Sequence, residues 1–139
     1  MPSFTVHTPG PYGEKQLKEW SYSQVAEVNG RIELSGQGGY HSKTLDYPKG
    51  VTLEEEIERA FNNVTIMLKA VGLDWSHVVN VDTFHVPEPD GYIVASTTEV
   101  AKQFANRMPG YKPIWTALGV AVLGDPGMRV EVRVTAYRP

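Results

Sequence analysis

Near the C-terminus, apolar and polar side chains alternate strictly along the chain. The apolar positions of this stretch are Val130, Val132, Val134 and Ala136. A period of two is typical of a β-strand with one buried face, so residues 129–136 are predicted to form such a strand. Glu131 falls on its polar face, between Arg129 and Arg133. Two flanking guanidinium groups would favour the ionised carboxylate and lower the pKa of Glu131.

A second β-rich segment, residues 113–120, precedes this strand and contains β-branched and aromatic residues. The connection between the two, residues 123–128, combines glycine, aspartate and proline, which favour turns. We therefore predict that the two C-terminal strands form a hairpin.

Two further strands are predicted over residues 22–28 and 31–36, because the intervening Asn29-Gly30 is a strong signal for a two-residue hairpin turn. Residues 36–50 are rich in glycine and polar side chains and are expected to form a loop. The segment before Trp20 is rich in proline, glycine and lysine. We expect it to form an irregular arm or a short edge strand.

Helical patterns occupy the middle of the chain. Thr52 and Glu55 have the spacing of a capping box, and apolar residues then recur at helical spacing up to Gly72, a typical residue after a helix C-terminus. Residues 78–86 are predicted to form a strand buried on at least one face. A second helix is predicted from about residue 91 to residue 107.

The predicted order is β-β-α-β-α-β-β, which indicates an α+β fold with one mixed sheet and both helices on one face. A length of 139 residues without an internal linker fits a single domain, residues 1–139. The chain offers no third helix for the other face of the sheet, so that face needs another cover.

Composition and charge narrow the possible functions. The chain has no cysteine, and therefore no disulfide, thiolate nucleophile or cysteine-based metal site. Its net charge of −3 and pI of about 5.8 argue against nucleic acid as the main partner. No apolar run is long enough to span a membrane, so we expect no membrane partner and a cytoplasmic location. The four histidines are dispersed, and no metal site is predicted.

Five short segments occur in order along the chain: Ser21-Tyr22-Ser23-Gln24, Leu34-Ser35-Gly36-Gln37, Ala70-Val71-Gly72, Thr98-Glu99-Val100 and the final strand around Glu131. Together they resemble the motifs of the Rid/YjgF family, the imine and enamine deaminases. The resemblance extends over residues 21–137 and leaves the first twenty residues uncovered.

The resemblance implies a chorismate-mutase-like fold, in which a mixed sheet of six strands carries two helices on one face. It also implies a homotrimer with ligand clefts between subunits, a small-molecule substrate and no cofactor. The implied reaction is hydrolysis or tautomerisation of an imine or enamine. In this reaction Glu131 would move a proton or orient water.

The resemblance also suggests residues that contact the substrate. Tyr22 matches a tyrosine of the family's cleft, and Ser35 and Gly36 match a loop edge where the backbone approaches a ligand. Thr116 and Val120 fall in the C-terminal motif, and backbone groups near Val120 are candidates to polarise the developing charge.

Trp115 stands where the family has an arginine that binds the substrate carboxylate. A charge-assisted contact of that kind is worth about 1.5–3 kcal/mol. Indole offers a large apolar face and one N–H donor instead. Small 2-imino acids are therefore expected to be poor substrates, and bulkier, aromatic or less anionic ligands better ones. The alternative is that Trp115 fills the cleft and nothing binds there.

Two other functions stay open. The chain could be a non-catalytic trimer that binds a ligand or a protein, with Glu131 only one member of a charge ladder on an amphipathic strand. A ribonuclease activity, attributed to some relatives, is less favoured. The chain has neither a patch of basic and aromatic residues nor a histidine pair for phosphodiester chemistry.

Overall fold

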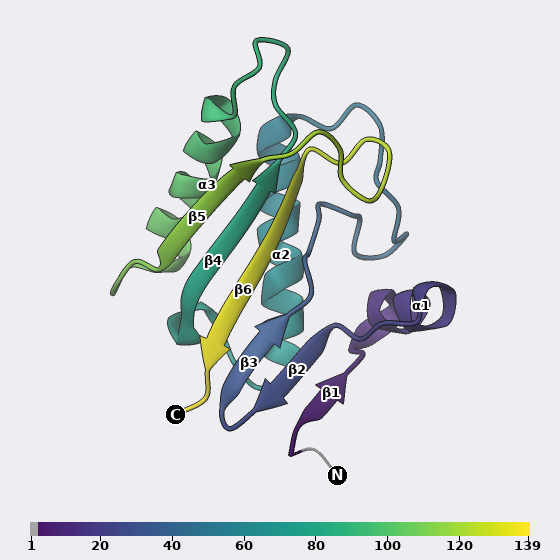
Figure 1. Ribbon diagram of the computed structural model, residues 1–139, viewed down its shortest axis with the longest axis vertical. Coiled ribbons are helices and arrows are strands. Elements are labelled where there is room, and N and C mark those ends of the chain that lie inside the picture. Colours follow the sequence, from purple (N-terminus) through teal and green to yellow (C-terminus); the bar gives the residue numbers. More distant parts are fainter. Residues whose placement is uncertain (1–2) are drawn as a thin grey trace.

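A computed structural model describes residues 3–139 and contains one sheet with the strand order β1-β2-β3-β6-β4-β5 (Figure 1). The strands are β1 (Thr5–His7), β2 (Val25–Val28), β3 (Arg31–Leu34), β4 (Val78–His85), β5 (Ile114–Gly119) and β6 (Val130–Tyr137). β4 and β5 are parallel, whereas all other neighbouring strands are antiparallel. The expected α+β fold with a mixed six-stranded sheet is confirmed.

Helices α2 (Leu53–Ala70) and α3 (Val94–Arg107) lie on the same face of the sheet, behind it in Figure 1. At the start of α2, the Glu55 N–H donates to Thr52 Oγ1 at 3.1 Å and the Thr52 N–H donates to Glu55 Oε2 at 3.2 Å. The predicted capping box is therefore confirmed. Gly72 follows the helix with a φ of 77°, a conformation that glycine adopts without steric cost.

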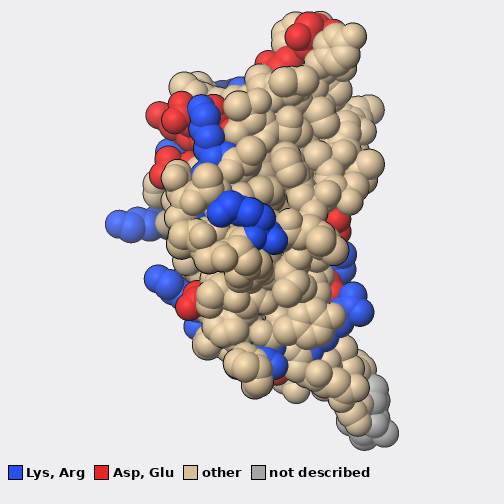
Figure 2. Space-filling view, turned by 90° about the vertical axis from the view of Figure 1, so that its left-hand side faces the viewer, with Lys and Arg blue, Asp and Glu red and all other residues tan. Residues whose placement is uncertain are grey.

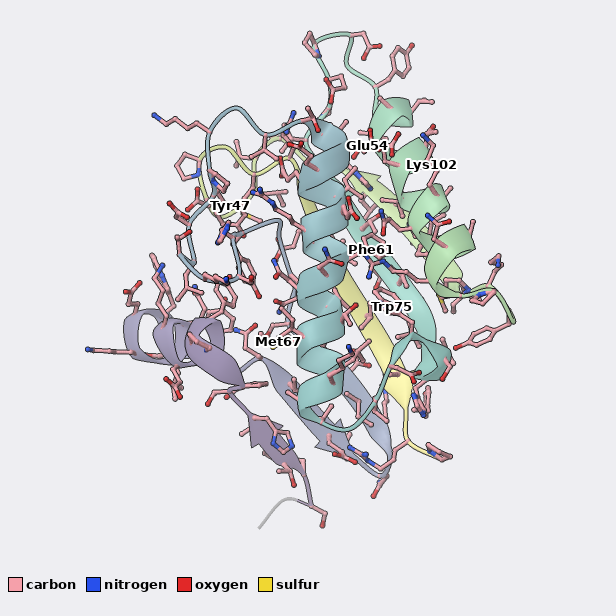
Figure 3. The ribbon with its side chains drawn as sticks, turned by 180° about the vertical axis from the view of Figure 1, so that it is seen from behind. Tyr47, Glu54, Phe61, Met67, Trp75 and Lys102 are labelled. Carbon is pink, nitrogen blue, oxygen red and sulfur yellow. The ribbon has the colours of Figure 1, made fainter. Side chains whose placement is uncertain are left out.

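The hydrophobic core fills the space between the sheet and these two helices. Phe61 of α2 stacks on Trp75 at a centroid distance of 5.2 Å (Figure 3). It also meets Phe104 of α3 edge to face at a centroid distance of 5.8 Å. β6 contributes Val130, Val132 and Val134, all fully buried. The alternation seen in the sequence thus separates the core face of β6 from its polar face.

The predicted C-terminal hairpin is wrong, because β4 lies between β5 and β6. β4 pairs in parallel with β5 on one side and antiparallel with β6 on the other. A parallel neighbour needs a crossover connection, and α3 supplies it between β4 and β5. The turn-forming residues 123–128 belong to a longer connection that carries the chain past β4.

Residues 10–20 form a helix, α1 (Gly10–Trp20), where we expected an irregular arm or a short edge strand. Pro11 suits the first turn of a helix, and the residues after Gly13 are mostly good helix formers. Gly13 also allows close packing, because a Cβ at this position would lie 2.6 Å from the Thr8 carbonyl carbon. The edge strand is nevertheless present as β1, which pairs with β2 ahead of the helix.

The face of β4, β5 and β6 that is turned away from α2 and α3 carries no helix among residues 3–139 (Figure 1). Several large apolar side chains remain exposed on this side of the sheet: Val28 of β2, Ile114 and Leu118 of β5, and Tyr137 of β6. No helix within the described residues is both long and apolar enough to cross a membrane.

Candidate functional site

A cavity of about 460 Å³ opens beside the start of β6 and includes three predicted site residues, Tyr22, Gly36 and Glu131. Helix α1, the loop after β3 and the connection before β6 form its walls. Other residues that line the cavity include Tyr12, Lys15, Gln16, Trp20, Tyr47 and Asp125. The fold thus joins a predicted strand, a predicted loop and an unpredicted helix around the Glu131 carboxylate.

Glu131 is the half-buried carboxylate of this cavity, and it projects from the face of β6 opposite the core valines. Among residues 3–139, no hydrogen bond or ion pair reaches its oxygens. Burial raises the pKa of Glu131, because removing water disfavours the charged form. Such a carboxyl holds its proton closer to neutral pH than an ordinary glutamate does.

The two arginines that flank Glu131 in the sequence serve other carboxylates, so the expected lowering of its pKa is wrong. Arg129 donates from Nε to Glu56 Oε1 at 2.8 Å and from Nη2 to the Val51 carbonyl at 2.7 Å. Arg133 donates to Glu33 Oε2 at 3.1 Å. The alternating sequence pattern correctly placed both arginines on the same strand as Glu131. It did not determine which carboxylates their long side chains reach.

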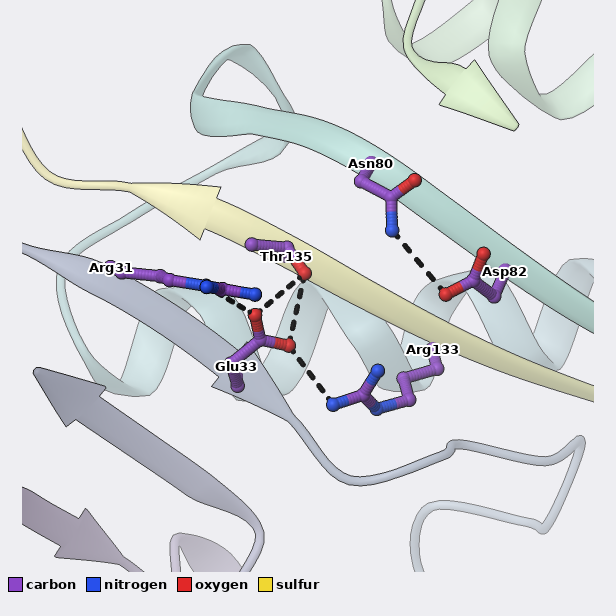
Figure 4. A network of polar contacts seen from close by, with 6 residues as sticks. All are labelled: Arg31, Glu33, Asn80, Asp82, Arg133 and Thr135. Atoms are coloured by element: carbon purple, nitrogen blue, oxygen red, sulfur yellow. Dashed lines mark hydrogen bonds and ion pairs between the residues drawn. The ribbon is translucent and has the colours of Figure 1, made fainter. Parts of the chain in front are cut away.

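Glu33 on β3 lies at the centre of the polar cluster in Figure 4. Arg31 donates from Nε to Glu33 Oε1 at 2.7 Å, and the Thr135 hydroxyl lies 2.9 Å from both carboxylate oxygens. With Arg133, two guanidinium groups neutralise this carboxylate, and the Thr135 hydroxyl adds a hydrogen bond. The cluster is therefore a satisfied structural group on the same sheet face as Glu131.

Gly36 permits the position of Glu131. A Cβ at residue 36 would lie 2.7 Å from Glu131 Cδ and closer still to one carboxylate oxygen. The sequence suggested that this glycine lets the backbone approach a ligand. In the structure, the group that comes close is the Glu131 side chain itself, so a side chain at residue 36 would displace it.

Aromatic side chains form much of the cavity wall. Tyr12 stacks on Tyr40 with a centroid distance of 3.6 Å, and Tyr47 meets Tyr40 edge to face at 6.2 Å. Burial raises the pKa values of Tyr12 and Tyr47, so both phenols stay neutral at physiological pH. The Tyr22 hydroxyl donates to Gln16 Oε1 at 3.2 Å, which ties the predicted site tyrosine to α1.

Ser35 lies next to the cavity and supports its loop. Its hydroxyl donates to the Ser23 carbonyl at 2.8 Å, and its N–H donates to the Gln24 carbonyl at 2.7 Å. Behind it, the buried Gln37 donates to Gln24 Oε1 at 2.7 Å. These bonds anchor the segment that presents Gly36, so Ser35 acts on the site through the backbone.

Trp115, Thr116 and Val120 do not line this cavity. Trp115 projects to the helix side of β5, where it meets Phe104 edge to face at 5.1 Å and donates to Thr83 Oγ1 at 2.9 Å. Thr116 is exposed on the opposite face. The Val120 N–H donates to the His85 carbonyl at 2.8 Å, so that donor is already engaged.

His85 belongs to a buried polar network next to Trp115. Its Nε2 lies 2.7 Å from Thr83 Oγ1, and its Nδ1 contacts the Ser96 hydroxyl of α3. Burial lowers the pKa of His85 to about 4, so the imidazole is neutral at physiological pH. Within residues 3–139, no group of three histidine, cysteine, aspartate or glutamate side chains could hold a metal ion.

Sequence reasoning missed Tyr12, Lys15 and Tyr47, which also line the cavity. Tyr12 and Lys15 lie on α1, outside the segment covered by the family motifs, and Tyr47 lies in a loop without a motif. The signal available for α1 was the spacing of Tyr12, Gln16 and Trp20, which places them on one face of a helix.

Comparison with protein-family models matches residues 14–138 to the family described as Endoribonuclease L-PSP. The chain is 28% identical to the RutC family protein YjgH of Escherichia coli over 130 residues, covering 93% of this chain and 92% of that protein. It is 31% identical to the mouse (Mus musculus) 2-iminobutanoate/2-iminopropanoate deaminase over 118 residues, covering 84% of this chain and 81% of that enzyme.

Solved structures agree with this assignment. The structure of protein YJGH superposes with a TM-score of 0.73 at 27% identity and covers 99% of this chain and 98% of that one. The Rid protein YyfA from Yersinia pestis superposes with a TM-score of 0.78 at 20% identity, covering 97% and 99% of the two chains, and shows the shared fold.

Proposed function

This chain belongs to the Endoribonuclease L-PSP family, the Rid/YjgF proteins, and we propose that it hydrolyses an imine or enamine in the Glu131 cavity. One observation carries the proposal: a half-buried carboxylate without a protein partner lies in a cavity large enough for a small molecule. Deaminases among the relatives support the same class of reaction.

The chemistry requires one group that moves protons at the C=N bond. Glu131 takes a proton from water as the water oxygen bonds to the imine carbon, and then gives a proton to the nitrogen. This gives a carbinolamine. Glu131 then carries the hydroxyl proton to the amine nitrogen as the C–N bond breaks, so that ammonia leaves and a carbonyl compound remains. A carboxyl with a raised pKa suits both transfers, because its affinity for a proton is closer to that of its partners.

The proposed assembly is a cytoplasmic homotrimer whose subunits cover one another's open sheet faces. Exposed Ile114 and Leu118 on β5 support this, since a neighbouring subunit would bury them. Seen from the side of β5 and α3, the surface is mostly uncharged, with scattered charged side chains (Figure 2). In a trimer, the exposed Thr116 would contribute to a cleft with the neighbouring subunit. By contrast, Trp115 stays packed on Phe104, and the Val120 N–H stays bonded to the His85 carbonyl. Because no arginine stands at residue 115, substrates other than small 2-imino acids would be preferred.

The deciding experiment measures ammonia release from imines generated in situ from small and aromatic amino acids. Glu131→Gln should lower kcat by about 100- to 10,000-fold, the usual contribution of a positioned acid–base group, while ligand binding persists. Glu33→Gln is the matched control, because Glu33 lies on the same sheet face outside the cavity. Equal turnover by wild type and Glu131→Gln would contradict the mechanism.

A non-catalytic ligand-binding trimer is the second candidate, and Trp115 in place of the family's arginine favours it. Under that function, the wild-type protein binds carbonyl analogues in the cavity but releases no ammonia from any imine. Binding would then persist in Glu131→Gln, because the carboxylate has no proton to transfer.

A further inference from the structure

We infer that Lys15 on α1 binds an acidic group of the ligand, and that the ligand of the Glu131 cavity is an imine or enamine of an aromatic acid. The inference rests on the proposed function for the kind of reaction. The binding subsite itself rests on the walls of the cavity.

Lys15 is the basic residue that lines this cavity. It is half-buried, and no ion pair joins it to a described residue of the chain. Asp46 is near enough for the Lys15 charge to contribute to the lowered pKa of that carboxyl, after the larger effect of the Thr44 hydroxyl. Because no ion pair within residues 3–139 engages the Lys15 ammonium, its N–H donors are available to a ligand.

Other cations near β5 and β6 are already engaged in structural contacts. Arg133 pairs with Glu33, and Arg129 pairs with Glu56. Lys112 donates to the Met108 carbonyl at 2.6 Å, and Arg107 donates to Asn62 Oδ1 at 2.7 Å. Neither Lys112 nor Arg107 lines the cavity, so they do not replace the family's arginine there.

The inner face of α1 has the composition of a ligand wall. Tyr12, Lys15, Gln16 and Trp20 follow helical spacing and all line the cavity. A helix face that only packed on the sheet would be apolar, whereas this one combines two aromatic rings, an amide and an ammonium. Tyr22 and Tyr47 also line the cavity, so it offers flat aromatic surfaces in addition to Lys15 and Glu131.

These surfaces select the ligand. A cavity of about 460 Å³ is far larger than a three- or four-carbon imino acid needs, and such a ligand would leave the aromatic walls without contacts. An aromatic ring contacts more of these walls and can stack on the tyrosines. The acidic group then meets Lys15, and the C=N bond meets the Glu131 carboxyl.

Binding of stable carbonyl analogues tests the inference without requiring turnover. The probes are 3-phenyl-2-oxopropanoate, the neutral 1-phenylpropan-2-one and pyruvate, with affinities measured by titration calorimetry. Wild type should bind 3-phenyl-2-oxopropanoate more tightly than pyruvate. Lys15→Met should lower the affinity for 3-phenyl-2-oxopropanoate about 10- to 100-fold and leave the affinity for 1-phenylpropan-2-one unchanged.

Lys18→Met is the matched control, because Lys18 lies on the same helix, is exposed and does not line the cavity. Its affinities should equal those of the wild type. The inference is overturned if wild type does not bind the aromatic anion, or if Lys15→Met weakens both aromatic probes equally or neither. If binding depends on Lys15 but no imine releases ammonia, the Lys15 subsite is supported and the proposed hydrolase activity is refuted. If the protein turns over imines and Lys15→Met does not change this turnover, the hydrolase activity is supported and the Lys15 subsite is refuted.

Discussion

Glu33 and Glu131 are two carboxylates on the same face of one sheet, yet their surroundings are opposite. Glu33 accepts hydrogen bonds from Arg31, Arg133 and Thr135 (Figure 4). Glu131, on the strand that also carries Arg133 and Thr135, has no such partner among the described residues and has its pKa raised by burial. Arg133, two residues after Glu131 in the sequence, thus neutralises the other carboxylate.

The difference separates a structural charge from a functional one. A carboxylate with several donors is held in one geometry and in one protonation state. A half-buried carboxylate without donors costs stability, and proteins retain such groups where chemistry or binding uses them. Charge patterning alone would have assigned both glutamates to the same ladder.

Gly36→Ala should give the largest effect, because the added methyl group would occupy the space of the Glu131 carboxylate. We expect kcat/KM for imine hydrolysis to fall by at least about 100-fold, as expected when a catalytic group is displaced by about 1 Å. Gly110→Ala is the control, since a Cβ at residue 110 meets no atom within 4 Å. Wild-type kcat/KM in Gly36→Ala would show that the close packing does not position Glu131.

Glu33→Ala should affect stability and leave turnover unchanged. It removes the acceptor used by Arg31, Arg133 and Thr135, of which the threonine is buried. Because the arginines are largely exposed, we expect the free energy of unfolding in urea to fall by only about 1 kcal/mol. A loss of turnover at unchanged stability would mean that this cluster belongs to the active site.

On stability, Glu131→Gln should have the smallest effect, a modest rise in melting temperature at neutral pH, in contrast to its large loss of kcat. Because the folded-state pKa of Glu131 is raised, the folded chain binds more protons than the unfolded chain between the ordinary value, about 4.3, and the raised value. Wild-type stability therefore falls as pH rises through this window, and the glutamine variant escapes that loss. Melting temperatures of the two proteins should coincide below about pH 4 and diverge above it. A lower melting temperature for the variant at pH 7 would contradict the raised pKa.

The sequence by itself determined the core face of β6, the capped helix α2 and the strand pair β2 and β3. Each depends on neighbours close along the chain: a period of two, the Thr52–Glu55 spacing, or the Asn29-Gly30 turn. The family motifs also identified Tyr22, Gly36 and Glu131, which the fold brings to one cavity.

The tertiary structure alone decided how the strands are ordered and which charges meet. β4 separates β5 from β6 because the α3 crossover makes β4 and β5 parallel neighbours, a long-range choice that local turn residues do not encode. Arg133 reaches Glu33, one hundred residues away along the chain, in preference to Glu131. Trp115 faces the core and Lys15 faces the cavity for the same reason: the direction of a long side chain is set by the elements packed around it, and these come from distant parts of the sequence.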